Sequence, residues 1–139
     1  MVFQRTTLAF GLSVLAMVLS CKATSEDADF RNAIVEGIRS NCGPFDPDKG
    51  KDSKAGGRFI FGRAIGRDGY AEILFYGISD PDEIRRLEAA ASEQLAKHHG
   101  RHLEIYFYDR IIYTEDGSNS YRSRNGKLIR KTVINSSHA

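Results

Sequence analysis

Apolar side chains repeat with a helical period in residues 30–42. They recur every four residues, and two further positions widen the stripe: Phe30, Ile34, Ile38 and Cys42, with Ala33 and Val35. This spacing predicts a helix of about four turns that lies on an apolar surface. Asn41, Gly43 and Pro44 are typical of a helix end. Residues 45–57 are rich in Pro, Gly, Lys and Asp, which predicts a solvated, flexible loop.

A hairpin and a second helix are predicted next. Two strands, residues 59–65 and 70–78, flank the sequence Gly66-Arg67-Asp68-Gly69, which is typical of a hairpin turn. Residues 80–83 (Asp-Pro-Asp-Glu) place a cap, a first-turn proline and a capping-box glutamate in their usual positions. The helix that they begin is expected to end at residues 97–100, and its apolar face consists of Ile84, Leu87, Ala91 and Leu95.

The remaining residues predict a long hairpin, with a strand from His102 to Tyr113, a polar turn and a returning strand from Tyr121 to Asn135. The element order is therefore helix-strand-strand-helix-strand-strand. We expect an α+β fold in which two helices cover one face of a four-stranded sheet. This order resembles a ferredoxin-like sandwich whose first strand has moved to the end. It is also similar, over most of residues 28–135, to the order of elements in the bacterial BON domain of envelope and stress proteins.

Two of the predicted strands have nearly the same sequence, Tyr70-Ala-Glu-Ile-Leu-Phe-Tyr76 and His102-Leu-Glu-Ile-Tyr-Phe-Tyr108. Side chains alternate between the two faces of a strand, so one face is apolar and should lie under the helices. The other face is unusually rich in tyrosine, which combines a large contact area with a polar tip. This face is predicted either to bind a partner or to be covered by another element, and its residues are Tyr70, Glu72, Leu74, Tyr76, His102, Glu104, Tyr106 and Tyr108.

Candidate catalytic and metal-binding groups are few. Glu72, Glu104 and His102 could serve a small hydrolase, because a pair of carboxylates can act as general acid and base. His98 and His99 stand near His102, but Gly100 interrupts the helix between them, so the side chains need not converge on a metal. We therefore expect no metal and no cofactor, and no nucleophile motif is present.

Positive charge is concentrated near the end of the chain, at Arg122, Arg124, Lys127, Arg130 and Lys131. These residues could bind anionic lipid head groups or acidic glycans. The alternative is an edge strand that its charges protect from aggregation. The formal net charge of the whole chain is only +2, which indicates no general affinity for nucleic acid.

The first 21 residues have the pattern of an export signal. Arg5 precedes an apolar run from Leu8 to Leu19, which is too short to span a bilayer. The ending Val18-Leu19-Ser20-Cys21 resembles the lipobox of bacterial lipoproteins. The resemblance implies removal of residues 1–20 and a lipid on Cys21. The rest of the chain would then comprise a tether at residues 21–28 and one domain at residues 29–139.

The resemblance to lipoproteins also implies a location and a redox state. We expect a lipid anchor in the cell envelope, on the periplasmic side of the outer membrane where two membranes exist. Cleavage at an ordinary signal-peptidase site, which would give a secreted or periplasmic protein, is the alternative. A lipid on Cys21 would leave Cys42 as an unpaired thiol.

Together these features predict a non-catalytic envelope lipoprotein whose small domain binds a macromolecule, foremost a protein of the envelope. An immunity-like or inhibitor-like role fits this class, because the tyrosine-rich strands are accompanied by no catalytic motif. Two alternatives remain open. One is the small envelope hydrolase, and the other is an assembly or stress module of the BON kind that binds phospholipid.

Overall fold

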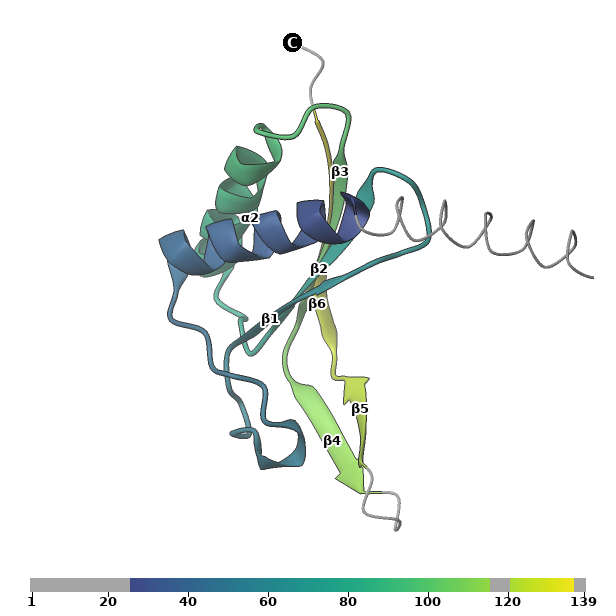
Figure 1. Cartoon of the computed structure of the whole chain (residues 1–139). Coiled ribbons are helices and arrows are strands. Elements are labelled where there is room, and N and C mark those ends of the chain that lie inside the picture. The colour runs from purple at the N-terminus through teal and green to yellow at the C-terminus, as the bar shows by residue number, and fades with distance from the viewer. Residues whose placement is uncertain (1–25, 116–120, 137–139) are drawn as a thin grey trace, which may run out of the picture.

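The computed structural model describes residues 26–115 and 121–136, which form two layers (Figure 1). The first helix covers residues 26–42. The other elements, in chain order, are η1 (Gly50–Asp52), β1 (Phe59–Arg63), β2 (Tyr70–Tyr76), α2 (Pro81–Leu95), β3 (His102–Tyr108), β4 (Ile111–Glu115), β5 (Tyr121–Asn125) and β6 (Leu128–Asn135).

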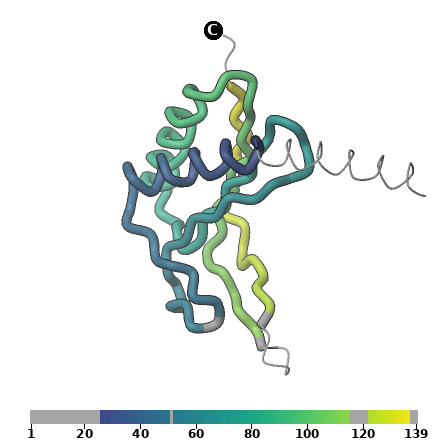
Figure 2. Tube along the Cα trace, in the orientation of Figure 1, coloured from purple at the N-terminus to yellow at the C-terminus, as the bar shows by residue number. Residues whose placement is uncertain are grey.

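The main sheet has four strands in the order β1-β2-β3-β6. β2 and β3 are parallel and are joined through α2, whereas β1 and β6 pair antiparallel with their neighbours. Figures 1 and 2 show both helices on the same face of this sheet. The predicted α+β fold, with its order helix-strand-strand-helix-strand-strand, is therefore confirmed.

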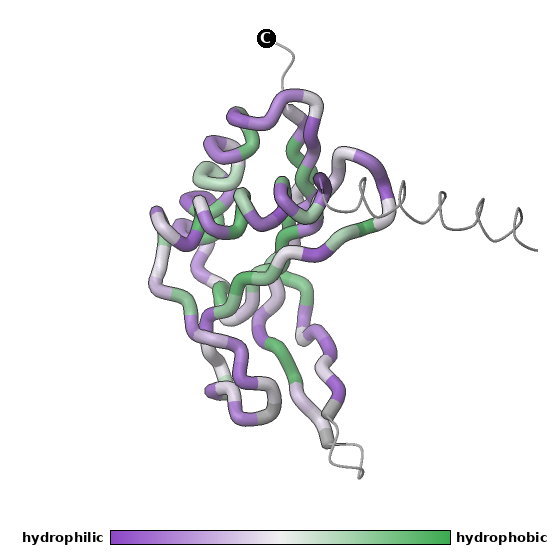
Figure 3. The backbone as a smooth tube through the Cα atoms, in the orientation of Figure 1, coloured by the Kyte–Doolittle hydropathy of each residue, from purple (hydrophilic) through white to green (hydrophobic). Residues whose placement is uncertain are grey.

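The helices cover the face of the sheet that the strand pattern predicts to be apolar. Phe30, Ile34 and Ile38 of the first helix are buried, and Cys42 packs at the margin of the same core. Ala33 was expected to widen the apolar stripe, but it is exposed. The apolar segments therefore lie along the inner sides of the helices and along the strands (Figure 3).

The start of α2 differs from the prediction in one contact. Asp80 is the N-cap, and its side chain accepts a hydrogen bond from the Asp82 amide at 3.2 Å. Glu83 does not complete a capping box, because it forms an ion pair with Arg58 at the base of β1. This glutamate therefore fastens the helix to the edge of the sheet. The helix ends at Leu95, and a turn with Gly100 at φ 75° leads into β3.

The predicted long hairpin is broken in two, because each of its strands is interrupted. Asp109 causes the break: its amide donates to the Lys127 carbonyl at 3.0 Å, and its carboxylate accepts from the Lys127 amide at 2.6 Å. Gly126 packs against the Asp109 carboxylate, and a larger residue would collide with it. β6 therefore returns along β3 as predicted, whereas β4 and β5 form a separate two-stranded sheet, here called the ribbon.

The loop of residues 45–57 is largely exposed, as its composition predicts, but it is held at several points. Phe45 packs on the core, and the Asp46 carboxylate accepts from the Arg58 amide at 2.8 Å. Further along, the Asp48 carboxylate accepts from the Gly50 amide at 2.9 Å. The loop thus lies beside the ribbon in a defined position (Figure 1).

Candidate binding site

The strand register brings the predicted tyrosine-rich residues together on one face. Tyr70 lies opposite His102, Glu72 opposite Glu104, Leu74 opposite Tyr106, and Tyr76 opposite Tyr108. We call this set of eight residues the tyrosine face. It lies on the side of the sheet away from the helices, because the alternating residues Ile73, Phe75, Leu103, Ile105 and Phe107 belong to the helix-covered core.

One end of the tyrosine face is covered by the chain itself. Tyr76 is only 3% exposed and Leu74 only 5%, and both pack with Phe59 in a second apolar cluster. The Tyr76 hydroxyl donates to Asn125 Oδ1 of the ribbon at 2.6 Å. Burial, with a smaller contribution from Tyr108, raises the pKa of Tyr76 to about 12. An open Tyr76 was one of the two predicted alternatives, and it is wrong because the ribbon turns back over this end.

The opposite end is half-buried and accessible. The rings of Tyr70 and His102 stack with their centroids 4.5 Å apart, and the Arg67 guanidinium lies 4.0 Å from the Tyr70 centroid. His102 Nδ1 lies 2.8 Å from Asn135 Oδ1 of β6. These contacts hold the two rings in place, and we call Tyr70 and His102 the aromatic end. A fixed aromatic group loses little freedom when it binds.

The two glutamates of the tyrosine face are each engaged by a cation of this chain. Glu72, which is 5% exposed, pairs with Arg63, and Glu104 Oε1 lies 3.8 Å from Lys131 Nζ. A hydrogen bond with Tyr106 raises the pKa of Lys131. The hydrolase hypothesis needs two carboxylates available to a substrate, and these contacts occupy both. It stays a prediction that the geometry does not favour.

A groove of about 560 Å³ opens where the tyrosine face, the ribbon and the loop of residues 45–57 meet. The Tyr113 hydroxyl donates to Asp48 Oδ1 at 2.6 Å and thereby connects the ribbon to the loop. This hydrogen bond is the main cause that lowers the pKa of Asp48 from its ordinary value of 3.8. The groove is lined by Asp48, Phe61, Arg63, Leu74, Tyr76, Ile111, Tyr113, Ser123, Arg124 and Asn125.

Sequence reasoning missed this groove, because the groove depends on the break at Asp109. Its lining combines apolar and aromatic side chains with two arginines, Arg63 from β1 and Arg124 from the ribbon. Within the described part of the chain, Arg124 forms no ion pair. The groove therefore suits a group that has an apolar body and an anionic tip.

The five predicted cations do not form one patch. Arg130 Nε lies 2.8 Å from Glu88 Oε1 of α2, and Lys131 lies on the tyrosine face beside Glu104. Arg122 and Arg124 belong to the ribbon, and Lys127 is exposed at the corner between β5 and β6. Two of the five are therefore engaged in ion pairs with glutamates, which weakens the case for a continuous anionic-surface site.

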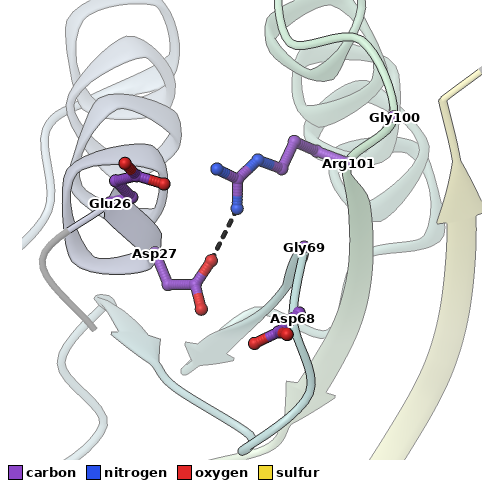
Figure 4. Close-up of a pocket in the computed structure, with 6 residues that line it drawn as sticks. All are labelled: Glu26, Asp27, Asp68, Gly69, Gly100 and Arg101. Atoms are coloured by element: carbon purple, nitrogen blue, oxygen red, sulfur yellow. Dashed lines mark hydrogen bonds and ion pairs between the residues drawn. The ribbon is translucent and has the colours of Figure 1, made fainter. Parts of the chain in front are cut away.

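A second pocket lies where the first helix begins (Figure 4). Arg101 points from the start of β3 toward Asp27, with Nη1 2.6 Å from Asp27 Oδ1, while Glu26 and Asp68 lie nearby. The Arg101 guanidinium also lies 5.1 Å from the Phe30 centroid, and the His98 ring packs edge-on against the same phenylalanine. The ion pair between Arg101 and Asp27 joins residues far apart in sequence, so no local pattern could predict it. It fixes the start of the first helix on the sheet.

The structure gives limited information on the predicted lipid anchor and on metal binding. Of the predicted tether at residues 21–28, Cys21 and residues 22–25 lie outside the described residues, whereas residues 26–28 belong to the first helix. Cys42 is a free, half-buried cysteine. In residues 26–115 and 121–136 no three His, Cys, Asp or Glu side chains are placed to hold a metal ion. Within those same ranges, no helix has both the length and the apolar character needed to cross a membrane.

Comparison with known protein families, with curated proteins and with solved structures finds no match. The surfaces of this chain that suit binding are chiefly the groove and the aromatic end.

Proposed function

We propose that this chain is a lipid-anchored protein of a bacterial cell envelope whose domain binds a protein partner without catalysis. The anchor is the lipid on Cys21, and the partner is bound by the groove together with the aromatic end. The observation that carries the proposal is the groove, whose lining combines aromatic and aliphatic side chains with Arg63 and Arg124. A masking role, in the manner of an immunity protein or an inhibitor, fits such a surface.

Protein partners suit this surface for a physical reason. Interface cores are enriched in tyrosine, phenylalanine and arginine, which supply contact area together with directed hydrogen bonds. Phe61, Tyr106 and Tyr108 are half-buried around the fully buried Tyr76, so their rings are held in place before binding. A partner segment with an apolar side chain and a nearby carboxylate would fill the groove and reach Arg124. An occupant of this kind would leave no buried charge without a partner.

The anchor is tested separately from the binding surface. Cys21→Ser removes the acylated thiol, so the variant should move from the detergent phase to the aqueous phase on detergent partitioning. Palmitate labelling should be lost together with the partition. A variant that partitions like the wild type would refute the lipid anchor and would leave the groove untouched.

The binding surface is tested by crosslinked capture of envelope proteins on the full chain. Arg124→Glu reverses the charge at the edge of the groove, and we expect it to lower recovery of the bound protein by about tenfold, or ~1.4 kcal/mol. Lys127→Glu is the matched control, because Lys127 is exposed and does not line the groove. Equal losses in both variants would indicate general charge attraction and contradict the assignment. Failure to capture any protein from intact envelopes would overturn the proposed function.

A further inference from the structure

β6 is an edge strand with an unusual amount of exposed apolar surface. It spans eight residues at one side of the main sheet, and among the described residues it pairs with β3 alone. In the described part of the chain the exposed large hydrophobic residues all lie on β6: Leu128 at 46%, Ile129 at 37% and Val133 at 50%. Proteins usually shorten or charge such an edge, because its free backbone groups can pair with another strand.

The charges that could guard this edge are largely neutralised within the chain. Arg130 is paired with Glu88 of α2, whose other carboxylate oxygen accepts from the Thr132 hydroxyl at 2.9 Å. Lys131 is paired with Glu104 on the opposite face. The edge of β6 therefore presents apolar side chains and ion pairs without a large excess of charge, so little repels a second strand from its backbone.

The backbone hydrogen bonds show which groups of β6 are available. The Ser136 amide donates to the Arg101 carbonyl of the segment that leads into β3, at 3.1 Å. Backbone groups alternate in direction along an antiparallel strand, so those of residues 130, 132 and 134 also face β3. The N–H and C=O groups of Lys131, Val133 and Asn135 therefore point outward, away from the sheet.

We propose that β6 pairs antiparallel with β6 of a second copy of this chain, about a two-fold axis at Val133. This register is self-complementary. Val133 meets Val133 of the second copy, and Lys131 meets Asn135, so no cation lies directly opposite another. The outward backbone groups of all three residues are satisfied in this arrangement, and the exposed valines pack on each other.

The pairing has a consequence for the tyrosine face. Directly opposed residues of an antiparallel pair point to the same side, so the two sheets join into one with both tyrosine faces on the same side. A dimeric partner could then be bound at both grooves at once, which raises the overall affinity. The dimer depends only on β6, so it stands or falls independently of the lipid anchor and of the groove.

Site-directed crosslinking of the full chain in detergent tests the register. In a hydrogen-bonded antiparallel pair the Cα atoms are about 5.5 Å apart, which suits a disulfide. Val133→Cys should therefore form a covalent dimer under mild oxidation. Leu128→Cys is the matched control, because the same register places its two copies ten residues apart, or about 33 Å. The wild type reveals any crosslink through Cys21 or Cys42.

The expected result is about tenfold more covalent dimer in Val133→Cys than in Leu128→Cys or the wild type. Equal yields in the two variants, or no dimer in Val133→Cys, would overturn the proposed pairing. Sedimentation provides a second readout. Val133→Arg opposes two cations at the axis, so this variant should sediment as a monomer where the wild type is a dimer. Its unfolding midpoint should match that of the wild type at concentrations low enough for the wild type to be monomeric. The proposal would also be overturned if the wild-type chain were monomeric at every concentration. Pairing of β6 only with an acidic strand of another protein would overturn it as well.

Discussion

The two faces of the main sheet are made from the same strands but are covered in different ways. On the helix-covered face, Ile73, Phe75, Leu103, Ile105 and Phe107 are all 0% exposed. On the tyrosine face, Tyr76 is buried under the ribbon, whereas Tyr70 and His102 are half-buried. The first face is covered along its whole length by two amphipathic helices, and the second is covered at one end by the chain's own continuation.

The difference shows how a small domain can combine a stable core with an accessible surface. Burial of the helix-covered face contributes most of the hydrophobic stabilisation, because it removes the largest apolar area from water. The tyrosine face adds a smaller cluster and keeps its other end for contacts outside the domain. Stability and binding should therefore respond to different substitutions.

The largest expected effect is a difference between the two faces in how much a substitution lowers the free energy of unfolding. Phe75→Ala removes a fully buried ring that stacks on Phe107 with centroids 4.8 Å apart, and we expect a loss of about 3–5 kcal/mol in the free energy of unfolding. Tyr106→Ala removes a half-buried ring on the other face and should cost less than about 1.5 kcal/mol. Urea denaturation of both variants measures the difference. Equal losses would show that the tyrosine face is as much a part of the core as the helix-covered face.

Alkaline pH should weaken the covered end of the tyrosine face. The pKa of Tyr76 is about 12 in the folded chain and near 10 in a solvated tyrosine, so unfolding favours loss of its proton. The stabilisation is complete below about pH 10 and is lost as the pH rises toward 12, by an amount on the order of 2 kcal/mol.

Tyr76→Phe provides the control for this pH dependence. The variant loses the hydrogen bond to Asn125, which should cost about 1 kcal/mol near neutral pH. It should also lose the part of the alkaline destabilisation that belongs to this hydroxyl. The measurement is the unfolding midpoint of the wild type and of Tyr76→Phe between neutral pH and about pH 12. A parallel fall of the two midpoints with pH would contradict the assignment.

The sequence was sufficient to predict the faces of the sheet, because side-chain alternation in β2 and β3 is local and regular. Phe75 and Phe107 were assigned to the core, and Tyr70 and His102 to the opposite face, by this alternation alone. The first helix and α2 were likewise predicted from their apolar stripes, although Ala33 proved exposed. Local periodicity thus carries most of the fold.

The groove could not be predicted, because it depends on contacts between residues distant in sequence. The break between β3 and β4 depends on hydrogen bonds between Asp109 and Lys127, two residues that are distant in sequence. Only this break brings Asn125 to Tyr76 and Tyr113 to Asp48. Two features of the sequence could have indicated the break: Asp109, which is followed by another polar residue, and Gly126.

The smallest expected effect concerns the connection between the ribbon and the loop of residues 45–57. The Tyr113 hydroxyl, aided by the Gly50 amide and Ser53, holds the pKa of Asp48 below its ordinary value of 3.8. The ionised carboxylate is thus favoured by folding, and its stabilisation is present above about pH 4 and lost as the pH falls through the lowered pKa. Because Asp48 is exposed, the effect on global unfolding should stay below about 1 kcal/mol.

Hydrogen exchange at the Gly50 amide reports this connection more directly than global unfolding, because that amide donates to the Asp48 carboxylate. In the wild type its protection should fall on acidification. In Tyr113→Phe the protection should be lower at neutral pH and should change less on acidification, since the main cause of the lowered pKa is gone. Exchange at the Tyr76 amide in β2 provides the internal control for the same pH range. Identical acid responses in the two chains would mean that Tyr113 does not hold the loop, and one wall of the groove would then have no support from the ribbon.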